Sequence, residues 1–383
     1  MSTIHPLRRG EIHHARAEQV YPTIEPGSVS LAIIDGPYNM RKAEWDKFPS
    51  WEAFQDYYRA HIAALDRVMA PSATVYLWGS DESEGYLRLP MREAGWTYRG
   101  RIIWDKGGSK EDIGKDGMRR WADWTEVCGM YVRNEWEIDT CAGQQIAEAA
   151  GSDDRNPVTE FFAEERQASG MSRKELAQHF PSATGKITGC VANWELGYNF
   201  PTWEVWQTAA AAMRAEGIPR HRPYLVHPTI WNSDEDGEQY LRASYDHLRA
   251  EYDHLRAEYE AARYPFAHPM GVGNVWRHGQ VSGMERLRSE AGDALHPCQK
   301  PLAFYERMIR ASSRPGDLVL EPFGGTLRAA VAIERLPSDE ARRYVCIEPD
   351  EDGRDYIAAV LKSLRFEPGD EKNGQPSLFG GAA

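Results

Sequence analysis

A carboxylate, a rigid turn and an aromatic ring follow one another at Asp35-Gly36-Pro37-Tyr38. Asp35 can accept a hydrogen bond from an amino group, and the Gly36 carbonyl can accept another, because Pro37 holds the turn extended. Tyr38 offers a face on which a planar ring could stack. These groups suit the exocyclic amine of a nucleobase, which must first be flipped out of a duplex. The alternative interpretation is a tight turn after a core strand, with Tyr38 packed on the sheet.

A second group that could bind a ligand lies near the carboxyl end of the chain. Gly324 and Gly325 follow a β-rich run at 317–323, and Glu348 lies near the end of the next run. A glycine turn lets the backbone approach a ligand closely, and an acid at the next strand end can bind a ribose diol. Because ligands bind beyond the carboxyl ends of parallel strands, we expect Asp35 and this turn at one sheet edge.

The elements that would position these residues read as an α/β fold. Short β-rich runs alternate with helical patterns, which is typical of a parallel sheet with crossover helices. We expect strands at 29–35, 73–79, 97–106, 124–133, 317–323 and 342–350. We expect helices at 50–69 with Ser50 as N-cap, near 82–94, from 299 with Pro301 in the first turn, and at 327–336 and 351–364.

The middle of the chain follows a different pattern. Ser172 and Glu175 form a capping box for a short helix, and a second short helix, a break at Pro201 and a longer alanine-rich helix follow. This layout is that of a helix-turn-helix, although many helical hairpins share it.

A heptad recurs between residues 245 and 262. Tyr and Leu fall on one stripe, formed by Tyr245, Tyr252 and Tyr259 with Leu248, Leu255 and Ala262. Three heptads are marginal for a free coiled coil, so we expect a long helix packed on its own protein. A homodimer formed through the stripe is the alternative.

The overall charge excludes a uniformly basic nucleic-acid binder, because the formal net charge is −13. Any such surface must be a local patch. One candidate is the glycine-rich segment 105–121, in which acids alternate with Lys106, Lys110, Lys115, Arg119 and Arg120. A solvated loop of mixed charge is the alternative.

Composition also limits the compartment and the metal content. No apolar run approaches the roughly 20 residues that span a bilayer, and the N-terminus lacks the apolar core of a signal peptide. The five cysteines form no CxxC pair or Cys/His cluster at zinc spacing. We expect a cytoplasmic protein without a structural metal.

Four segments together resemble the amino-methylating DNA methyltransferases of N6-adenine or N4-cytosine specificity. They are "DGPY" at 35–38, "HPCQKP" at 296–301, "VLEPFGG" at 319–325 and "YVCIEPD" at 344–350. The order resembles the circularly permuted beta group, in which the catalytic tetrapeptide precedes the cofactor motifs. The resemblance covers about residues 20–135 and 294–365. It implies a Rossmann-like, doubly wound, mostly parallel α/β sheet with a mainly helical target-recognition insert.

The resemblance also implies roles for individual residues. Asp35, Gly36, Pro37 and Tyr38 match the tetrapeptide that binds the flipped base, and S-adenosylmethionine is the implied cofactor. The cofactor-binding residues are then Asp35, Lys300, Pro301, Glu321, Phe323, Gly324, Gly325, Thr326 and Glu348. Gly36 departs from the family's usual proline. Thr326, Leu327, Arg328 and Ala329 replace the usual Ser-Gly-Thr-Thr.

The activity implied is transfer of a methyl group to the exocyclic amine of a base in double-stranded DNA. Asp35 at the head of the tetrapeptide favours adenine N6, because N4-cytosine members more often begin with Ser. Cytosine N4 is the alternative. Cys298 follows a proline, as in cytosine-C5 methylation, but it precedes the cofactor turn, so we interpret it as a small half-buried residue.

A second class of function is a non-catalytic DNA-binding regulator built around residues 159–216 with a degenerate methyltransferase shell. In the insert, Arg173, Lys174, Lys186, Asn193 and Trp194 would then face DNA. For Trp194, Trp203 and Trp206 we favour an ordinary helical core.

The predicted organisation has four parts. Residues 1–140 form the catalytic half, 141–293 the insert, 294–366 the cofactor half, and 367–383 a disordered tail. The tail sequence "GQPSLFGG" resembles peptides that dock on the bacterial sliding clamp, with Gln375 hydrogen-bonded and Leu378 and Phe379 in an apolar pocket.

Overall fold

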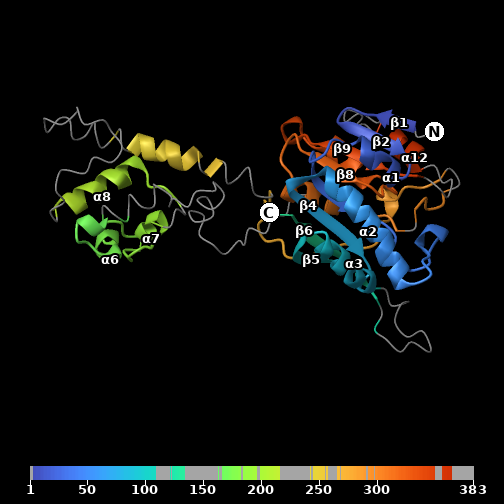
Figure 1. Cartoon of the computed structure of the whole chain (residues 1–383), viewed down its shortest axis with the longest axis horizontal. Coiled ribbons are helices and arrows are strands. Elements are labelled where there is room, and N and C mark those ends of the chain that lie inside the picture. The colour runs from blue at the N-terminus through green and yellow to red at the C-terminus, as the bar shows by residue number, and fades with distance from the viewer. Residues whose placement is uncertain are drawn as a thin grey trace. The chain divides into compact units, whose positions relative to one another are not determined.

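The chain divides into two compact units. The computed structural model describes most of residues 3–108, 121–133, 166–215, 242–257, 265–349 and 356–364, with short gaps. Met1–Glu135 and Tyr264–Ala383 form one unit, here called the α/β unit, and Trp136–Arg263 form the other, the helical unit (Figure 1). The functional boundaries expected at 140, 293 and 366 remain predictions.

A nine-stranded sheet lies at the centre of the α/β unit, in the order β1-β2-β9-β8-β3-β4-β6-β5-β7. Five neighbouring pairs are parallel, whereas β1–β2, β4–β6 and β5–β6 are antiparallel. The strands are β1 (Thr3–Pro6), β2 (Gly10–His14), β3 (Val29–Ile34), β4 (Met69–Gly79), β5 (Thr97–Asp105), β6 (Thr125–Val132), β7 (Val275–Arg277), β8 (Leu318–Glu321) and β9 (Arg343–Ile347). The predicted mostly parallel α/β fold is confirmed.

Strand β3 is the place where the two ends of the sequence meet. It pairs in parallel with β4 on one side and with β8 on the other, so that Ala32 lies opposite Val75 and Leu320. β8 in turn pairs in parallel with β9. The carboxyl ends of β3, β8 and β9 therefore open at the same edge of the sheet, as expected for a doubly wound fold.

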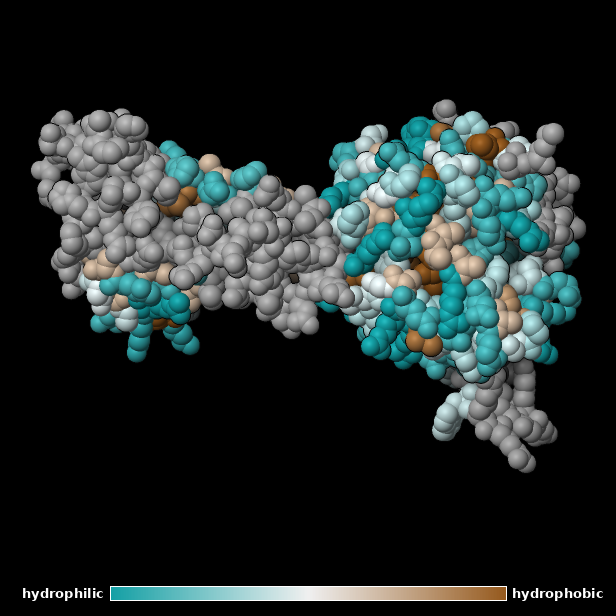
Figure 2. Space-filling model, viewed as in Figure 1, coloured by the Kyte–Doolittle hydropathy of each residue, from teal (hydrophilic) through white to brown (hydrophobic). Residues whose placement is uncertain are grey.

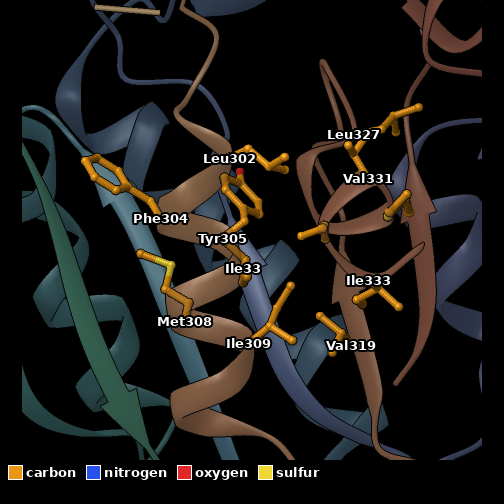
Figure 3. Close-up of a cluster of buried hydrophobic side chains, with 14 of the residues drawn as sticks. Ile33, Leu302, Phe304, Tyr305, Met308, Ile309, Val319, Leu327, Val331 and Ile333 are labelled. Carbon is orange, nitrogen blue, oxygen red and sulfur yellow. The ribbon is translucent and has the colours of Figure 1, made fainter. Parts of the chain in front are cut away.

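Helices cover both faces of this sheet. They are α1 (Ala17–Val20), α2 (Trp51–Val68), α3 (Asp81–Glu93), α10 (Leu302–Ser312), α11 (Arg328–Arg335) and α12 (Tyr356–Leu364). Alternate residues of β3 point to opposite faces, so Leu31 and Ile33 pack in one core cluster and Ala32 and Ile34 in the other. The first cluster holds α10 and α11 against the sheet (Figure 3). The second holds α2 and α3.

Local signals placed several of these elements correctly. Ser50 caps α2, because its side chain accepts a hydrogen bond from the Ala53 N–H, as predicted. The strand at 124–133 is present as β6, but it runs antiparallel to both of its neighbours instead of continuing a parallel sheet. β1, β2 and β7 were not predicted; each is short and lacks the continuous apolar run that marks β8 and β9.

The helical unit has a core of its own. Its helices include α6 (Arg173–Ala177), α7 (Cys190–Glu195) and α8 (Trp203–Ala215). Ser172 and Glu175 form the predicted capping box at the start of α6. Tryptophan and heptad side chains fill the core, namely Trp194, Trp206, Tyr245, Leu248 and Tyr252. The preference for a tryptophan core and for a heptad helix packed on its own protein is confirmed for Tyr245, Leu248 and Tyr252. Leu255, Tyr259 and Ala262 lie outside the described residues.

The surface of the α/β unit is mainly hydrophilic on the face drawn in Figure 2, and its hydrophobic patches are small and separate. Within the described parts of the chain, none of the helices is both long and apolar enough to cross a membrane.

Candidate functional site

A cavity of about 340 Å³ opens where β3, β8 and β9 end. Asp35, Gly36, Pro37 and Tyr38 line one part of it, directly after β3. The turn after β8 lines another part with Phe323, Gly324, Gly325 and Thr326, and Glu348 lines it after β9. The structure thus brings together residues that lie about 300 positions apart in the sequence.

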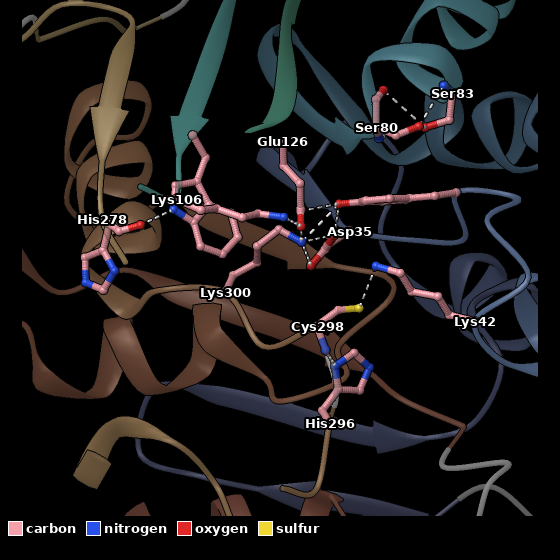
Figure 4. A network of polar contacts seen from close by, with 12 residues as sticks. Asp35, Lys42, Ser80, Ser83, Lys106, Glu126, His278, His296, Cys298 and Lys300 are labelled. Carbon is pink, nitrogen blue, oxygen red and sulfur yellow. Dashed lines mark hydrogen bonds and ion pairs between the residues drawn. The ribbon is translucent and has the colours of Figure 1, made fainter. Parts of the chain in front are cut away.

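Lys300 occupies the centre of a polar network beside this cavity. Its Nζ lies 2.8 Å from Asp35 Oδ1 and 2.9 Å from Asp35 Oδ2. It also lies 3.0 Å from a carboxylate oxygen of Glu126, which in turn binds Lys106 Nζ at 2.6 Å (Figure 4). The Lys300 side chain is only 1% exposed. A buried ammonium of this kind is stable only between carboxylates, so the four charges form one unit.

The pKa values in the network follow from this arrangement. Burial alone would raise the pKa of Glu126, but the ammonium groups of Lys300 and Lys106 outweigh burial and lower it to about 2. Burial would likewise lower the pKa of Lys300, but Asp35 and Glu126 raise it above its ordinary value. Glu126 and Lys300 are therefore charged at neutral pH.

The hydroxyl of Tyr38 belongs to the same network. It donates to Asp35 Oδ1 at 2.6 Å and accepts a hydrogen bond from Lys300 Nζ at 3.0 Å. Tyr38 is partly buried against the sheet core and also lines the cavity, so the alternative of a tyrosine packed on the sheet describes part of its environment. Oδ2 of Asp35 lacks the tyrosine contact, which leaves it the better acceptor for an incoming amine.

The loop after Tyr38 is shaped by Asp46, which the sequence did not reveal. The buried carboxylate accepts hydrogen bonds from the backbone N–H groups of Tyr38, Asn39, Met40 and Lys42. Asn39 and Arg41 have positive φ angles of 59° and 60°, which a fixed anchor can maintain. Asp46 therefore holds the aromatic end of the tetrapeptide in place. No periodic signal marks it, because the contact is made by loop backbone.

Gly36 has a structural reason in this chain. A Cβ at this position would lie 2.6 Å from the Tyr58 hydroxyl and 3.1 Å from the Phe323 ring. Tyr58 is buried and donates to the Pro37 carbonyl at 2.9 Å. The contacts of Tyr58 hold the Gly36-Pro37 turn in place, where the family's usual proline is missing at position 36.

The glycine turn after β8 has the close backbone packing that a bound ligand requires. A Cβ on Gly324 would lie 2.5 Å from the Leu327 side chain and 2.9 Å from the Ile347 carbonyl. The Gly325 N–H donates to a carboxylate oxygen of Glu348, which joins the turn to the end of β9. Leu327 takes a left-handed conformation with φ 51°, so it supplies the backbone shape that glycine usually gives. The glycine turn and the Glu348 carboxylate fit a nucleoside ligand, whose ribose diol Glu348 would bind.

Two predicted cofactor residues do not line the cavity. Pro301 is buried as the N-cap residue of α10. Glu321 is 0% exposed, because it ends β8 beneath the turn, and its Oε2 accepts from the Ala329 N–H at 3.1 Å. Burial raises the pKa of Glu321 to about 8. Both residues support the wall from behind.

A hydrophobic and aromatic wall completes the cavity. The Trp45 and His296 rings stack with centroids 6.3 Å apart, and Cys298 beside them is half-buried, as predicted. Cys298 Sγ lies 3.8 Å from Lys42 Nζ. A flat ligand group could pack along this wall.

The residues predicted to bind nucleic acid have different environments. Lys106 is paired with Glu126 beside the cavity, because its side chain turns toward that carboxylate. Lys110, Lys115, Arg119 and Arg120 lie outside the described residues. In the helical unit, Arg173, Lys174 and Lys186 are exposed and Asn193 is half-buried. The Arg173 side chain also contacts Glu195.

Comparisons with known proteins agree on one family. A family profile described as DNA methylase, of the N6/N4 methyltransferase type, matches residues 29–359. The chain is 32% identical over 97 residues to the type II methyltransferase M.HinfI of Haemophilus influenzae. It is 39% identical over 101 residues to the DNA adenine methyltransferase YhdJ of Escherichia coli (strain K12).

These curated relatives match over short stretches. The alignments cover 25% and 26% of this chain, and 26% and 30% of the two relatives. Among solved structures, the M1.HpyAVI–SAM complex has a TM-score of 0.45 and 14% identity, covering 92% of this chain and 98% of its own. The cytosine-N4-specific PvuII DNA methyltransferase has a TM-score of 0.47 and 12% identity, covering 94% and 88%. The family match spans most of the sequence, and the chain therefore belongs to the N6/N4 DNA methylase family.

Proposed function

We propose that this protein transfers a methyl group from S-adenosylmethionine to the exocyclic amine of a flipped base in double-stranded DNA, with adenine N6 favoured. The observation that carries the proposal is one cavity lined by Asp35, by the Phe323–Gly325 turn and by Glu348. An amine acceptor and a nucleoside-binding turn therefore lie within reach of one another.

The chain's own residues have distinct tasks in this proposal. Glu348 would hold the ribose of the cofactor, and the backbone of the glycine turn would pack against the cofactor. The bound cofactor supplies an electrophilic methyl group. Asp35 Oδ2 accepts a hydrogen bond from the target amine. The amine must also lose a proton when it gains the methyl group, and the same oxygen can take that proton. Lys300 keeps Asp35 in place through contacts of 2.8 and 2.9 Å to its two carboxylate oxygens.

Adenine is favoured over cytosine on two grounds. Asp35 heads the tetrapeptide, and the relative YhdJ is described as a DNA adenine methyltransferase. Cytosine N4 is the second candidate, because both bases present an exocyclic amine to the same acceptors.

Methylation of DNA by the purified protein tests the proposal. DNA incubated with S-adenosylmethionine is digested to nucleosides, and mass spectrometry should detect N6-methyladenine. N4-methylcytosine would instead establish the second candidate. The Asp35→Asn variant should bind S-adenosylhomocysteine as the wild type does but lose methyl transfer by at least about 100-fold. DNA binding without any cofactor binding by the wild type would favour the regulator and overturn the proposal.

Further partners and the location belong to this proposal. Lys174 and Lys186 on the helical unit would contact DNA, and the cytoplasm is the expected location. Gln375, Leu378 and Phe379 lie outside the described residues, so clamp docking rests on the tail sequence alone. A pull-down on the sliding clamp that is unchanged by deleting residues 375–379 would end that idea. A homodimer would need a surface other than the buried Tyr245, Leu248 and Tyr252.

A further inference from the structure

Arg328 is a buried cation in the wall of the cavity. It is the first residue of α11, it lines the cavity, and it is only 4% exposed. It also stands where the resemblance leads us to expect a threonine. A guanidinium is costly to bury, so its position in a ligand cavity calls for a physical reason.

The protein itself supplies little to balance this charge. Arg328 Nε donates to the Thr326 carbonyl at 3.1 Å, and the described residues give the two terminal nitrogens no hydrogen-bond partner. Glu321 and Glu285 act on Arg328 electrostatically, but no described carboxylate lies within ion-pair distance of it. The Ala329 N–H donates a hydrogen bond to one carboxylate oxygen of Glu321, and the Leu302 N–H donates one to Glu285. Burial accordingly lowers the pKa of Arg328.

The helix adds to the positive potential at the same place. The N-terminus of α11 carries the positive end of the helix dipole, where a cationic side chain is disfavoured and an anion is favoured. Arg328 occupies the first position of that helix. A buried guanidinium without an ion-pair partner among the described residues and a helix N-terminus therefore both adjoin the cavity, and both are suited to a carboxylate.

We propose that Arg328 binds the α-carboxylate of the cofactor's amino-acid portion. This inference rests on the proposed function, because S-adenosylmethionine carries one carboxylate together with its ribose diol. Glu348 and Arg328 both line the cavity, together with the Gly324–Gly325 turn. The planar guanidinium can bind both oxygens of a carboxylate, which a threonine hydroxyl cannot do.

Calorimetric binding in the absence of DNA tests the assignment without using turnover. S-adenosylhomocysteine keeps the carboxylate, whereas methylthioadenosine lacks the whole amino-acid portion. Arg328→Met should weaken S-adenosylhomocysteine binding by about 10- to 100-fold, the usual effect of losing a hydrogen bond to a charged group. Methylthioadenosine binding should change less than about twofold. Arg335→Met, on the exposed face of the same helix, is the matched control and should change neither affinity.

Two results would overturn the assignment. One is an equal loss of affinity for both ligands in Arg328→Met, which would indicate a structural role. The other is unchanged binding of S-adenosylhomocysteine. If Arg328→Met does not fold, the wild type still decides, because it should bind decarboxylated S-adenosylmethionine at least about 10-fold more weakly than S-adenosylmethionine. A wild type that binds no cofactor at all would instead refute the proposed function.

Discussion

Two buried carboxylates, one in each unit, each contact two cationic side chains, but those cations lead to different parts of the protein. Glu126 in the α/β unit lies between Lys106 and Lys300, and its side chain is 11% exposed. Glu195 in the helical unit contacts Arg166 and Arg173, and its side chain is 1% exposed. Each carboxylate is thus satisfied by two cations from other segments of the chain.

The difference lies in what the cations contact next. Lys300 continues from Glu126 to Asp35 and so reaches the cavity. Arg166 continues from Glu195 to the Met171 carbonyl, at 2.8 Å, which joins the backbone before α6 to the end of α7. A buried ion pair is therefore no sign of a functional site by itself. Its connection to a cavity is what distinguishes the two.

Removing the cation that links Glu126 to the cavity should have the largest effect. Lys300→Met removes the ammonium that both Asp35 and Glu126 contact, so Asp35 loses the partner that holds it in place and Glu126 loses a cation that lowers its pKa. We expect the single-turnover methylation rate to fall by roughly 100- to 1,000-fold. Lys362→Met, an exposed change on α12, is the control and should leave the rate unchanged. A rate within threefold of the wild type would show that Asp35 does not depend on Lys300.

The corresponding change in the helical unit should affect stability and spare the cavity. Glu195→Gln leaves the Arg166 guanidinium, only 12% exposed, without its counter-charge. We expect the helical unit to lose about 3 kcal/mol of stability, as for other broken buried pairs. Hydrogen exchange of residues 166–195 measures this loss, and calorimetry should find S-adenosylhomocysteine affinity unchanged. A loss of that affinity would contradict the separation of the two units' roles.

A matched change at Glu126 should reverse this pattern. Glu126→Gln keeps the shape but weakens the hold on Lys300, while Lys106 is 18% exposed and can gain water as a partner. We expect about a tenfold lower methylation rate, within the range of positioning contacts. Exchange protection of the helical unit should stay as in the wild type. Equal rates for the variant and the wild type would reduce Glu126 to a structural partner of Lys106.

A third buried carboxylate sharpens the comparison through its pH dependence. No described cation lies within ion-pair distance of Glu321, and burial raises its pKa to about 8 from the ordinary 4.5. Between pH 4.5 and about 8, Glu321 is therefore protonated in the folded state but ionised in the unfolded state. As pH rises through this range, the free energy of unfolding falls by up to roughly 1.4 kcal/mol per pH unit.

Glu321→Gln should remove this slope, which thermal unfolding of the α/β unit from pH 5 to 8 can measure. Glu126 has the opposite sign, because its pKa is lowered to about 2. Its stabilising contribution is complete above the ordinary pKa of 4.5 and is lost as pH falls toward 2. A Glu321→Gln variant with the same pH profile as the wild type would show that the carboxyl is ionised in the folded protein.

The sequence was most informative where apolar periodicity and caps agree. The strand and helix around Ile33 and Ser50 follow directly from such signals, and strand ends predict the edge at which ligands bind. β1 and β2 escaped notice because these strands of four and five residues are mostly polar and carry little apolar periodicity. The direction of β6 depends on its neighbours, which the segment itself does not specify.

The site was predictable only in part, for a related reason. Asp35 and Glu348 stand at strand ends and in recognisable motifs, whereas Glu126 lies inside β6, opposite Trp104 of β5. A lone acid in a strand ordinarily indicates a solvent face. Its pairing with Lys106 and Lys300 depends on residues 20 and 174 positions away, and it could have been suspected only as a charge interrupting an apolar run.

Leu327 has a consequence for how the protein can move. Its backbone takes a conformation that costs a side-chain-bearing residue roughly 1 kcal/mol, while its side chain is fully buried among the residues packed under α11. The loop that begins α11 is thus fastened to the hydrophobic interior by its own sequence. Glycine in this position would allow the loop to move without disturbing the core. With leucine, a movement of the loop away from the core must expose the Leu327 side chain to water. Local unfolding of this part of the cavity wall should therefore be coupled to local unfolding of the hydrophobic core under α11.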